Sequence, residues 1–250
     1  MSSKAAPMTS TPAHAKKGVL YLIPVPLGDS PLDYILPSEV RSIALRLDHF
    51  VAENAKSARA FLKQLPCANP IQQIEISELN EHTRSNQLPA LLAPLLAGHD
   101  LGLISEAGCP AVADPGAQLV NLAHASEIRV VPCVGPSSIL LALMGSGLSG
   151  QNFAFHGYLP AKDEQRHKQL RELESGSRRE QRTQIFIETP YRNRQLFDAL
   201  LRQCAPSTRL CLASDLTLAS ESIVTRSIAA WRKTTPPDID RRPTVFLLQA

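Results

Sequence analysis

Several common signatures are missing from this chain of 250 residues. Its five cysteines never stand two residues apart, and its seven histidines are scattered without zinc-ligand spacing, which argues against a disulfide framework and against a metal site. No run approaches the roughly 18 apolar residues of a membrane helix, and residues 1–17 lack the apolar core of a signal peptide. We therefore expect a disordered tail over 1–17 and a cytoplasmic protein with no membrane or metal partner.

The usual nucleotide and hydrolase motifs are also missing. There is no GxGxxG after the first apolar run, no GxxxxGK[ST], no GxSxG and no HExxH. These absences remove the motif-based case for a dinucleotide fold, a P-loop enzyme, an α/β-hydrolase or a zinc protease.

Composition and charge set broader bounds. Apolar residues make up 44% of the chain, enough for one large domain or two ordinary ones. Residues 1–150 hold 10 Lys/Arg against 12 Asp/Glu, whereas residues 151–250 hold 16 against 11. A basic second half is compatible with a phosphate-bearing partner, and it is equally compatible with an ordinary solvated surface.

Apolar runs alternate with helical patterns along the chain. Strands are predicted at 18–26, 49–53, 100–106, 128–134, 153–160, 184–190, 209–217 and 242–250, and helices at 37–50, 56–65, 88–99, 115–126, 135–147, 162–183 and 191–204. This alternation predicts an α/β fold with a mainly parallel sheet. The Gly/Ser-rich segment 145–152 is the best candidate linker, so we expect an N-terminal domain at 18–148 and a C-terminal α/β domain at 149–250.

Three loops stiffened by glycine and proline follow apolar strands in the first half. They read "PVPLGD" (24–29), "EAGCPAVADPG" (106–116) and "VGPSS" (134–138). Loops at the carboxyl ends of parallel strands line the ligand crevice of an open sheet, so these predict a ligand held mainly by main-chain groups. They are also what tight turns of such a sheet look like, and that interpretation stays open.

The same loops resemble a known family. "GVLYLIPVPLGD", "LGLISEAGCPAVADPGAQLV", "RVVPCVGPSSILLALMGSGL" and "FAFHGYLP", in this order, resemble the tetrapyrrole methylase superfamily of class III S-adenosylmethionine (SAM) methyltransferases. Within it they are most similar to the branch that methylates a cytidine ribose 2′-oxygen of small-subunit ribosomal RNA (rRNA). The resemblance implies two α/β domains, the second with a mixed sheet, SAM in the cleft between them, a homodimer, and rRNA or the small ribosomal subunit as partner.

The resemblance also implies site residues. Positions that match the family's cofactor contacts are Pro26, Leu27, Glu106, Gly108, Cys109, Pro110, Val112, Ala113, Ser137, Ser138, Ile187, Glu188 and Ala213. Basic candidates for RNA contacts are Lys56, Arg59, Lys162 and Arg192. No general base is identified, and Glu53, Asn80, Glu81 and His82 are the candidates.

The chain departs from the branch at several polar positions. After Glu53, the branch's Asp-Thr-Arg is replaced by Asn54, Ala55 and Lys56; Ala161 replaces an Arg, and Leu218 replaces a Lys. We expect these changes to lie away from the cofactor loops and to weaken an RNA site, which depends on arginine and lysine. An RNA 2′-O-methyltransferase is therefore the first hypothesis, and a small-molecule methylase and a non-catalytic SAM-binding module are the alternatives.

Overall fold

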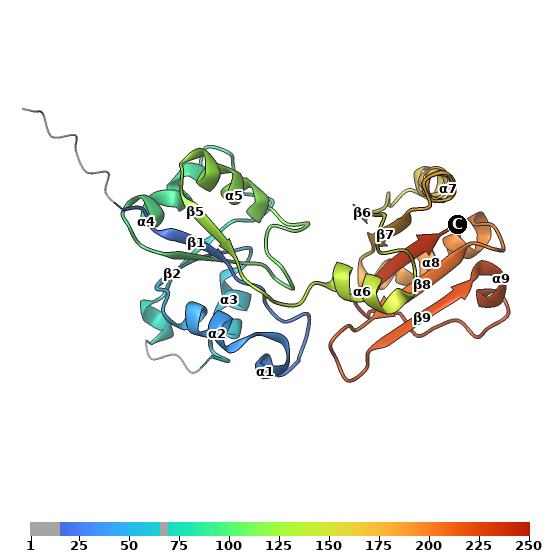
Figure 1. Ribbon diagram of the computed structural model, residues 1–250, viewed down its shortest axis with the longest axis horizontal. Coiled ribbons are helices and arrows are strands. Elements are labelled where there is room, and N and C mark those ends of the chain that lie inside the picture. The colour runs from blue at the N-terminus through green and yellow to red at the C-terminus, as the bar shows by residue number, and fades with distance from the viewer. Residues whose placement is uncertain (1–15, 66–69) are drawn as a thin grey trace, which may run out of the picture.

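Five strands of the first half form one sheet. The computed structural model describes residues 16–65 and 70–250, so all but Lys16 and Lys17 of the expected tail lie outside the described residues (Figure 1). The sheet has the order β3-β2-β4-β1-β5, and every pairing is parallel, which confirms the predicted parallel sheet. Its strands are β1 (Val19–Leu22), β2 (His49–Ala52), β3 (Glu75–Glu78), β4 (Leu101–Ile104) and β5 (Arg129–Pro132).

Helices cover both faces of this sheet (Figure 1). Strand β2 is apolar on both sides, so Phe50 packs with α2 and α3 whereas Val51 packs with α4 and α5 in a separate core. The helical elements are α1 (Leu32–Ile35), α2 (Ser38–Leu45), α3 (Ala55–Leu62), η1 (Ile71–Gln73), η2 (Leu88–Leu92), α4 (Ala93–Leu96) and α5 (Gly116–Ala125).

In the first half, α1 and η1 were not predicted, and two further elements differ from the sequence expectations. The apolar helix predicted at 88–99 is divided into η2 and α4, because Pro89 and Pro94 each lack the N–H that a continuous helix would use. Strand β3 was not predicted, because Glu75–Glu78 lies at the sheet edge and carries alternating polar side chains instead of an apolar run.

The second half contains a mixed sheet of five strands in the order β6-β7-β10-β8-β9. Only β6 and β7 pair in parallel; the other three pairings are antiparallel, which confirms the mixed sheet. The strands are β6 (Phe153–Tyr158), β7 (Thr183–Ile187), β8 (Arg209–Ser214), β9 (Ser222–Ser227) and β10 (Thr244–Gln249). The edge strand β9, half exposed and polar, is the one that the sequence pattern did not reveal.

Helix α6 (Ser138–Ser146) follows the last strand of the first sheet but packs on the second sheet. Its Ala142 and Leu143 share a core with Ile185 and Cys211, while α7 (Asp163–Glu180), α8 (Asn193–Gln203) and α9 (Ile228–Trp231) pack in a separate core. The short η3 (Pro190–Arg192) precedes α8. The predicted domain division at residue 148 stays a prediction, but α6 packs with the second half. Within the described ranges, no helix is both long and apolar enough to cross a membrane.

Candidate functional site

The three Gly/Pro-rich loops meet at the carboxyl edge of the first sheet. Val25 and Gly108 exchange two backbone hydrogen bonds, of 2.9 and 3.1 Å, which join the first loop to the second. The Cys109 thiol donates to the Pro136 carbonyl at 3.3 Å, which joins the second loop to the third. The predicted convergence of these loops is therefore confirmed.

Gly108 is required at this junction. Its φ is +71°, a left-handed conformation that side chains other than hydrogen disfavour. A Cβ added there would lie 3.1 Å from Leu27 Cδ2 and 3.4 Å from the Pro136 carbonyl oxygen. The close approach of the loops therefore depends on the absence of a side chain at this position.

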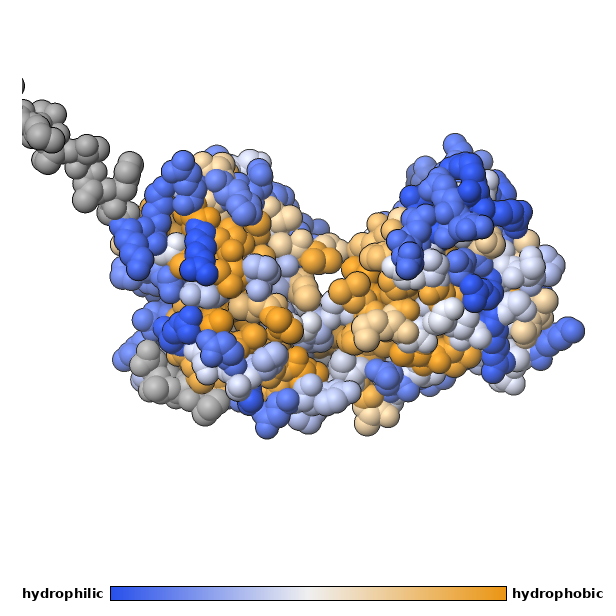
Figure 2. All heavy atoms as spheres, viewed as in Figure 1, coloured by the Kyte–Doolittle hydropathy of each residue, from blue (hydrophilic) through white to orange (hydrophobic). Residues whose placement is uncertain are grey.

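Two adjoining cavities open between the halves, where Figure 2 shows the surface to be hollowed. The first-half cavity, of about 270 Å³, is lined mainly by the loops after β4 and β5. The second-half cavity, of about 280 Å³, is lined mainly by the ends of β7, β8 and β10. Both cavities are lined by Ala107, Ser138, Tyr158 and Ile187, so together they form one cleft.

Most of the cofactor contacts implied by the resemblance line this cleft. Those in the first-half cavity are Glu106, Gly108, Cys109, Val112, Ala113, Ser137, Ser138 and Ile187. Those in the second-half cavity are Leu27, Ser138, Ile187, Glu188 and Ala213. Pro26 lines a smaller neighbouring cavity of about 240 Å³ beside α3, and Pro110 is not among the described residues that line any of the three.

The candidate bases separate into two groups. Glu53 lines the first-half cavity, directly after β2. Asn80, Glu81 and His82 form a turn after the edge strand β3, in which the Asn80 side chain accepts from the His82 N–H at 3.0 Å, and they are not among the described lining residues of the cleft. The geometry therefore leaves Glu53 as the candidate base in the cleft.

Three carboxylates, of Glu53, Glu106 and Asp114, gather in the first-half cavity. Burial, and then the nearby Asp114, raises the pKa of Glu53 above its ordinary value. Burial also raises the pKa of Asp114, although the N–H groups of Gly116 and Ala111 partly oppose this effect. Among the described residues that line the cleft, none is a lysine or an arginine, so the cavity suits a cationic ligand.

Helix α3 holds one of these carboxylates in place. The Ser57 hydroxyl donates to Glu106 Oε1 at 2.9 Å. The N-cap of α3 is Asn54, whose side chain accepts from the Lys56 N–H at 2.8 Å. Because asparagine and aspartate cap helices about equally well, the replacement of the branch's Asp by Asn54 preserves the helix start and removes only a charge.

The loop after β4 is held in a costly conformation. Ala111 and Ala113 both have φ of +64°, which costs roughly 1–2 kcal/mol for a residue with a side chain. The Asp114 carboxylate accepts from the Ala111 N–H at 2.9 Å and from the Gly116 N–H at 2.8 Å, which stabilises this turn. Such strain concentrates at functional sites.

The second-half cavity contains a buried carboxylate. The side chain of Glu188 is 0% exposed, and its Oε1 accepts from Arg192 Nη2 at 2.6 Å and from the Thr189 N–H at 2.7 Å. Its Oε2 has no hydrogen-bond partner among the described residues. Arg192, a candidate for RNA contact, is therefore engaged by Glu188, whereas Lys56, Arg59 and Lys162 are exposed.

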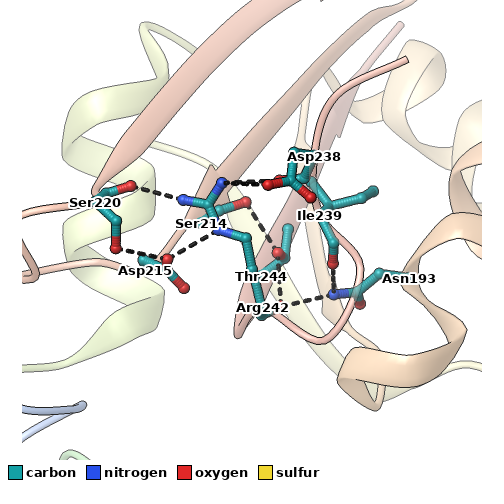
Figure 3. A network of polar contacts seen from close by, with 8 residues as sticks. All are labelled: Asn193, Ser214, Asp215, Ser220, Asp238, Ile239, Arg242 and Thr244. Atoms are coloured by element: carbon teal, nitrogen blue, oxygen red, sulfur yellow. Dashed lines mark hydrogen bonds and ion pairs between the residues drawn. The ribbon is translucent and has the colours of Figure 1, made fainter.

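An arginine clamp fixes the loop after β8, which forms another wall of the cleft (Figure 3). Arg242 donates to Asp215 Oδ2 at 2.8 Å, to the Ser220 carbonyl at 2.6 Å and to the Asp238 carbonyl at 2.8 Å. Within the clamped loop, Asp215 and Thr217 have φ of +50° and +71°. The clamp therefore stabilises a loop whose backbone alone would favour another conformation.

This loop also contacts the first half. The buried Ser30 hydroxyl lies 2.9 Å from the Thr217 carbonyl oxygen and donates to it. A Cβ on Gly28 would lie 2.9 Å from Leu218 Cδ2, so the two loops are in close contact. Leu218, which replaces a lysine of the branch, thus lines the cleft. The expectation that this change lies away from the cofactor site was wrong, because the loop after β8 folds back against the first loop.

Sequence reasoning missed several lining residues. Asp114 stood inside a quoted loop, but nothing in its spacing separated it from an ordinary turn residue. The clamp of Asp215 with Arg242 joins residues 27 positions apart, and the sequence pattern carries no signal for such a pairing.

The arrangement matches solved structures. The methyltransferase CobJ is similar over 94% of each chain with a TM-score of 0.61 and 17% identity. The cobalt precorrin-4 methyltransferase CbiF is similar over 92% of this chain and 94% of that one, with a TM-score of 0.58 and 12% identity. At these identities the likeness establishes the fold. Fold and cleft together define an α/β protein in which a parallel and a mixed sheet border one cleft.

The sequence is matched from residue 19 to residue 230 by the family of tetrapyrrole (corrin/porphyrin) methylases, and the chain belongs to this family. It is also similar to curated proteins named ribosomal RNA small subunit methyltransferase I. That of Escherichia coli O157:H7 is 30% identical over 84% of this chain and 70% of its own length. The protein of a Synechocystis strain is 31% identical over 88% of this chain and 76% of its own length. The protein of Xylella fastidiosa is 29% identical over 92% of this chain and 80% of its own length.

Proposed function

We propose that this chain transfers a methyl group from SAM to a ribose 2′-hydroxyl of small-subunit rRNA, in the cytoplasm. The names of its curated relatives support the rRNA acceptor, and identity of about 30% with them extends over most of the chain. The acidic cleft between the two sheets carries the proposal for the donor.

The donor suits the charges of the cleft. SAM bears a sulfonium, an ammonium and a carboxylate, so its net charge is positive. Glu53, Glu106 and Asp114 provide three carboxylates with no lysine or arginine among the lining residues described. Glu188, whose buried Oε2 has no partner among the described residues, also lines the adjoining cavity. The residues present therefore fit this donor, with the main-chain groups around Gly108 and Ser137 to hold its uncharged parts.

Bound in this cleft, SAM supplies a methyl group on sulfur: a C–O bond forms to the acceptor oxygen as the S–C bond breaks, and the electron pair of that bond goes to sulfur. Glu53 takes the hydroxyl proton in the proposal. Burial raises its pKa, which makes it a better proton acceptor than an ordinary exposed carboxylate. The two walls of the cleft align the reactants and exclude water, which supplies on the order of 7 kcal/mol in favourable cases.

The proposal includes a homodimer. Four large apolar side chains, those of Tyr34, Val134, Leu140 and Met144, are exposed on or near α1 and α6. Exposed apolar groups of this kind support contact with another protein surface, and a second copy is the partner proposed. Light scattering of the purified protein tests it: a mass of one chain at micromolar concentration would count against it.

The function is tested by titration and transfer. Calorimetry with SAM and with its demethylated product measures binding, and labelled SAM is then incubated with small-subunit rRNA, with small ribosomal subunits, and with a small-molecule extract containing porphyrinoids. Label in a ribose of the rRNA supports the proposal. Label only in a porphyrinoid would show a small-molecule methylase instead, and binding without any transfer would show a non-catalytic module.

A further inference from the structure

Two tyrosine side chains are exposed at the same edge of the second sheet. The chain has four tyrosines, and aromatic residues make up only 5% of it. Tyr158, at the end of β6, is 58% exposed, and Tyr191, in η3 after β7, is 71% exposed. Strands β6 and β7 are parallel neighbours, with Tyr158 opposite Ile187. Both tyrosines therefore follow the carboxyl ends of adjacent strands.

This edge borders the cleft. Tyr158 lines both cavities, and Pro190, the neighbour of Tyr191, lines the second-half cavity. Glu53 and Asp114 line the first-half cavity together with Tyr158. An acceptor that reaches Glu53 in this cavity therefore shares the cavity with Tyr158, and Tyr191 is the next residue after the lining Pro190.

On this side of the cleft, the inside and the rim differ in charge. The lining carboxylates lie inside, whereas cations accompany the tyrosines. The Arg192 guanidinium lies 5.6 Å from the Tyr191 ring centroid, and Lys162 follows Tyr158 by four residues and is exposed. Arg241 is also exposed, and its N–H donates to the Pro190 carbonyl at 3.1 Å.

The neighbouring acids only partly offset these cations. Glu188 is buried beneath Arg192, and Asp163 is paired with the buried Arg166. Asp240 is exposed next to Arg241. The inside of the cleft therefore repels phosphate, while the exposed Lys162 and Arg241 are the cations of the tyrosine rim not paired with a buried acid.

We propose that Tyr158 and Tyr191 are a stacking platform for unpaired RNA bases next to the acceptor nucleotide, whose phosphates stay at the rim. Aromatic faces with adjacent arginine and lysine are how proteins hold single-stranded RNA, since an unpaired base exposes a face that a duplex hides. The inference rests on the proposed RNA acceptor and adds to it that the acceptor segment is single-stranded.

The test replaces each tyrosine by alanine and by phenylalanine. Phe153→Ala is the matched control, because Phe153 is 40% exposed at the start of β6 and is not a described lining residue of the cleft. Tyr158→Ala and Tyr191→Ala should each raise KM for small-subunit rRNA about 5- to 100-fold, the range for loss of one stacked base. The Kd for SAM should change less than twofold, and Tyr158→Phe, Tyr191→Phe and Phe153→Ala should match wild type.

A binding assay separates this inference from the proposed function. A fluorescein-labelled 12-nucleotide single-stranded RNA of mixed sequence, and a duplex of the same length, are titrated with each protein and followed by anisotropy. Preferred binding of the single strand that is weakened in both alanine variants supports the platform even if no methyl transfer is found. The inference would be overturned if wild type does not bind the single-stranded RNA, or if all variants bind it equally. It would also be overturned if the alanine variants lose only the binding of a porphyrinoid. A loss of SAM affinity in Tyr158→Ala would overturn it for Tyr158, which would then be a wall of the donor site.

Discussion

The two walls of the cleft are built differently. The first-half wall consists of three loops in which glycine and proline shape the backbone and the Val25–Gly108 hydrogen bonds join neighbouring turns. The second-half wall is a loop held by side chains, with Arg242 as its centre. A wall made of backbone is visible in the sequence as Gly/Pro spacing, whereas a wall held by distant side-chain pairs is not.

The largest expected effect is at Gly108. Gly108→Val places a branched side chain at a φ of +71° and against Leu27 and Pro136, so the first-half wall should open. We expect SAM affinity to fall at least 100-fold by calorimetry. Gly150→Val is the control, because nothing lies within 4 Å of a Cβ at that position. Similar affinity in both variants would mean that the backbone wall does not bind the donor.

Arg242→Gln tests the side-chain wall. It leaves the Asp215 carboxylate without its cation, which should lower the free energy of unfolding by about 1–3 kcal/mol, since a largely buried acceptor loses a charged partner. SAM affinity should fall about tenfold as the loop loses its fixed conformation. Arg242→Lys should recover part of the stability and part of the SAM affinity. Arg194→Gln, which breaks the surface pair with Asp198, should change neither the free energy of unfolding nor the SAM affinity. If Arg194→Gln lowers both as much as Arg242→Gln does, the clamp has no special role.

Glu53→Gln tests the negative charge of the first-half wall. Burial and Asp114 raise the pKa of Glu53, so ionisation destabilises the folded protein as pH rises from about 4.5 through the raised pKa. Glu53→Gln should therefore melt at a higher temperature than wild type at pH 7, with the difference shrinking as pH falls toward 4.5. The rate of methyl transfer should drop at least tenfold. The affinity should fall more for SAM than for its demethylated product, because the sulfur of the product is uncharged. Unchanged transfer would exclude Glu53 as the base.

The smallest expected effect is at the contact between the walls. Ser30→Ala removes the hydrogen bond to the Thr217 carbonyl, worth about 1 kcal/mol, and should raise the Kd for SAM about two- to fivefold. Ser42→Ala removes an exposed hydrogen bond to the Ser38 carbonyl within α2 and should leave the Kd unchanged. If both variants bind SAM equally well, the contact between Ser30 and Thr217 does not contribute to the donor site.

The sequence allowed the core strands and most helices to be predicted, because buried strands are continuous apolar runs and helices repeat apolar residues at helical spacing. Strands β3 and β9 escaped because they lie at sheet edges and are half exposed. Of the site, the loops around Gly108 and Ser137 were predictable, since glycine and proline report backbone shape. Leu218 and Tyr158 were not, because their positions in the cleft depend on how the two halves meet. Arg242 was not, because its partners within the second half carry no sequence signal.

The central claim is that the two walls together hold a sulfonium donor, and calorimetric titration of the wild-type protein and Gly108→Val with SAM tests it most directly. We predict one donor bound per chain in the wild type and at least a 100-fold weaker Kd in the variant. No heat from the wild type, or equal Kd values in the two proteins, would contradict the account.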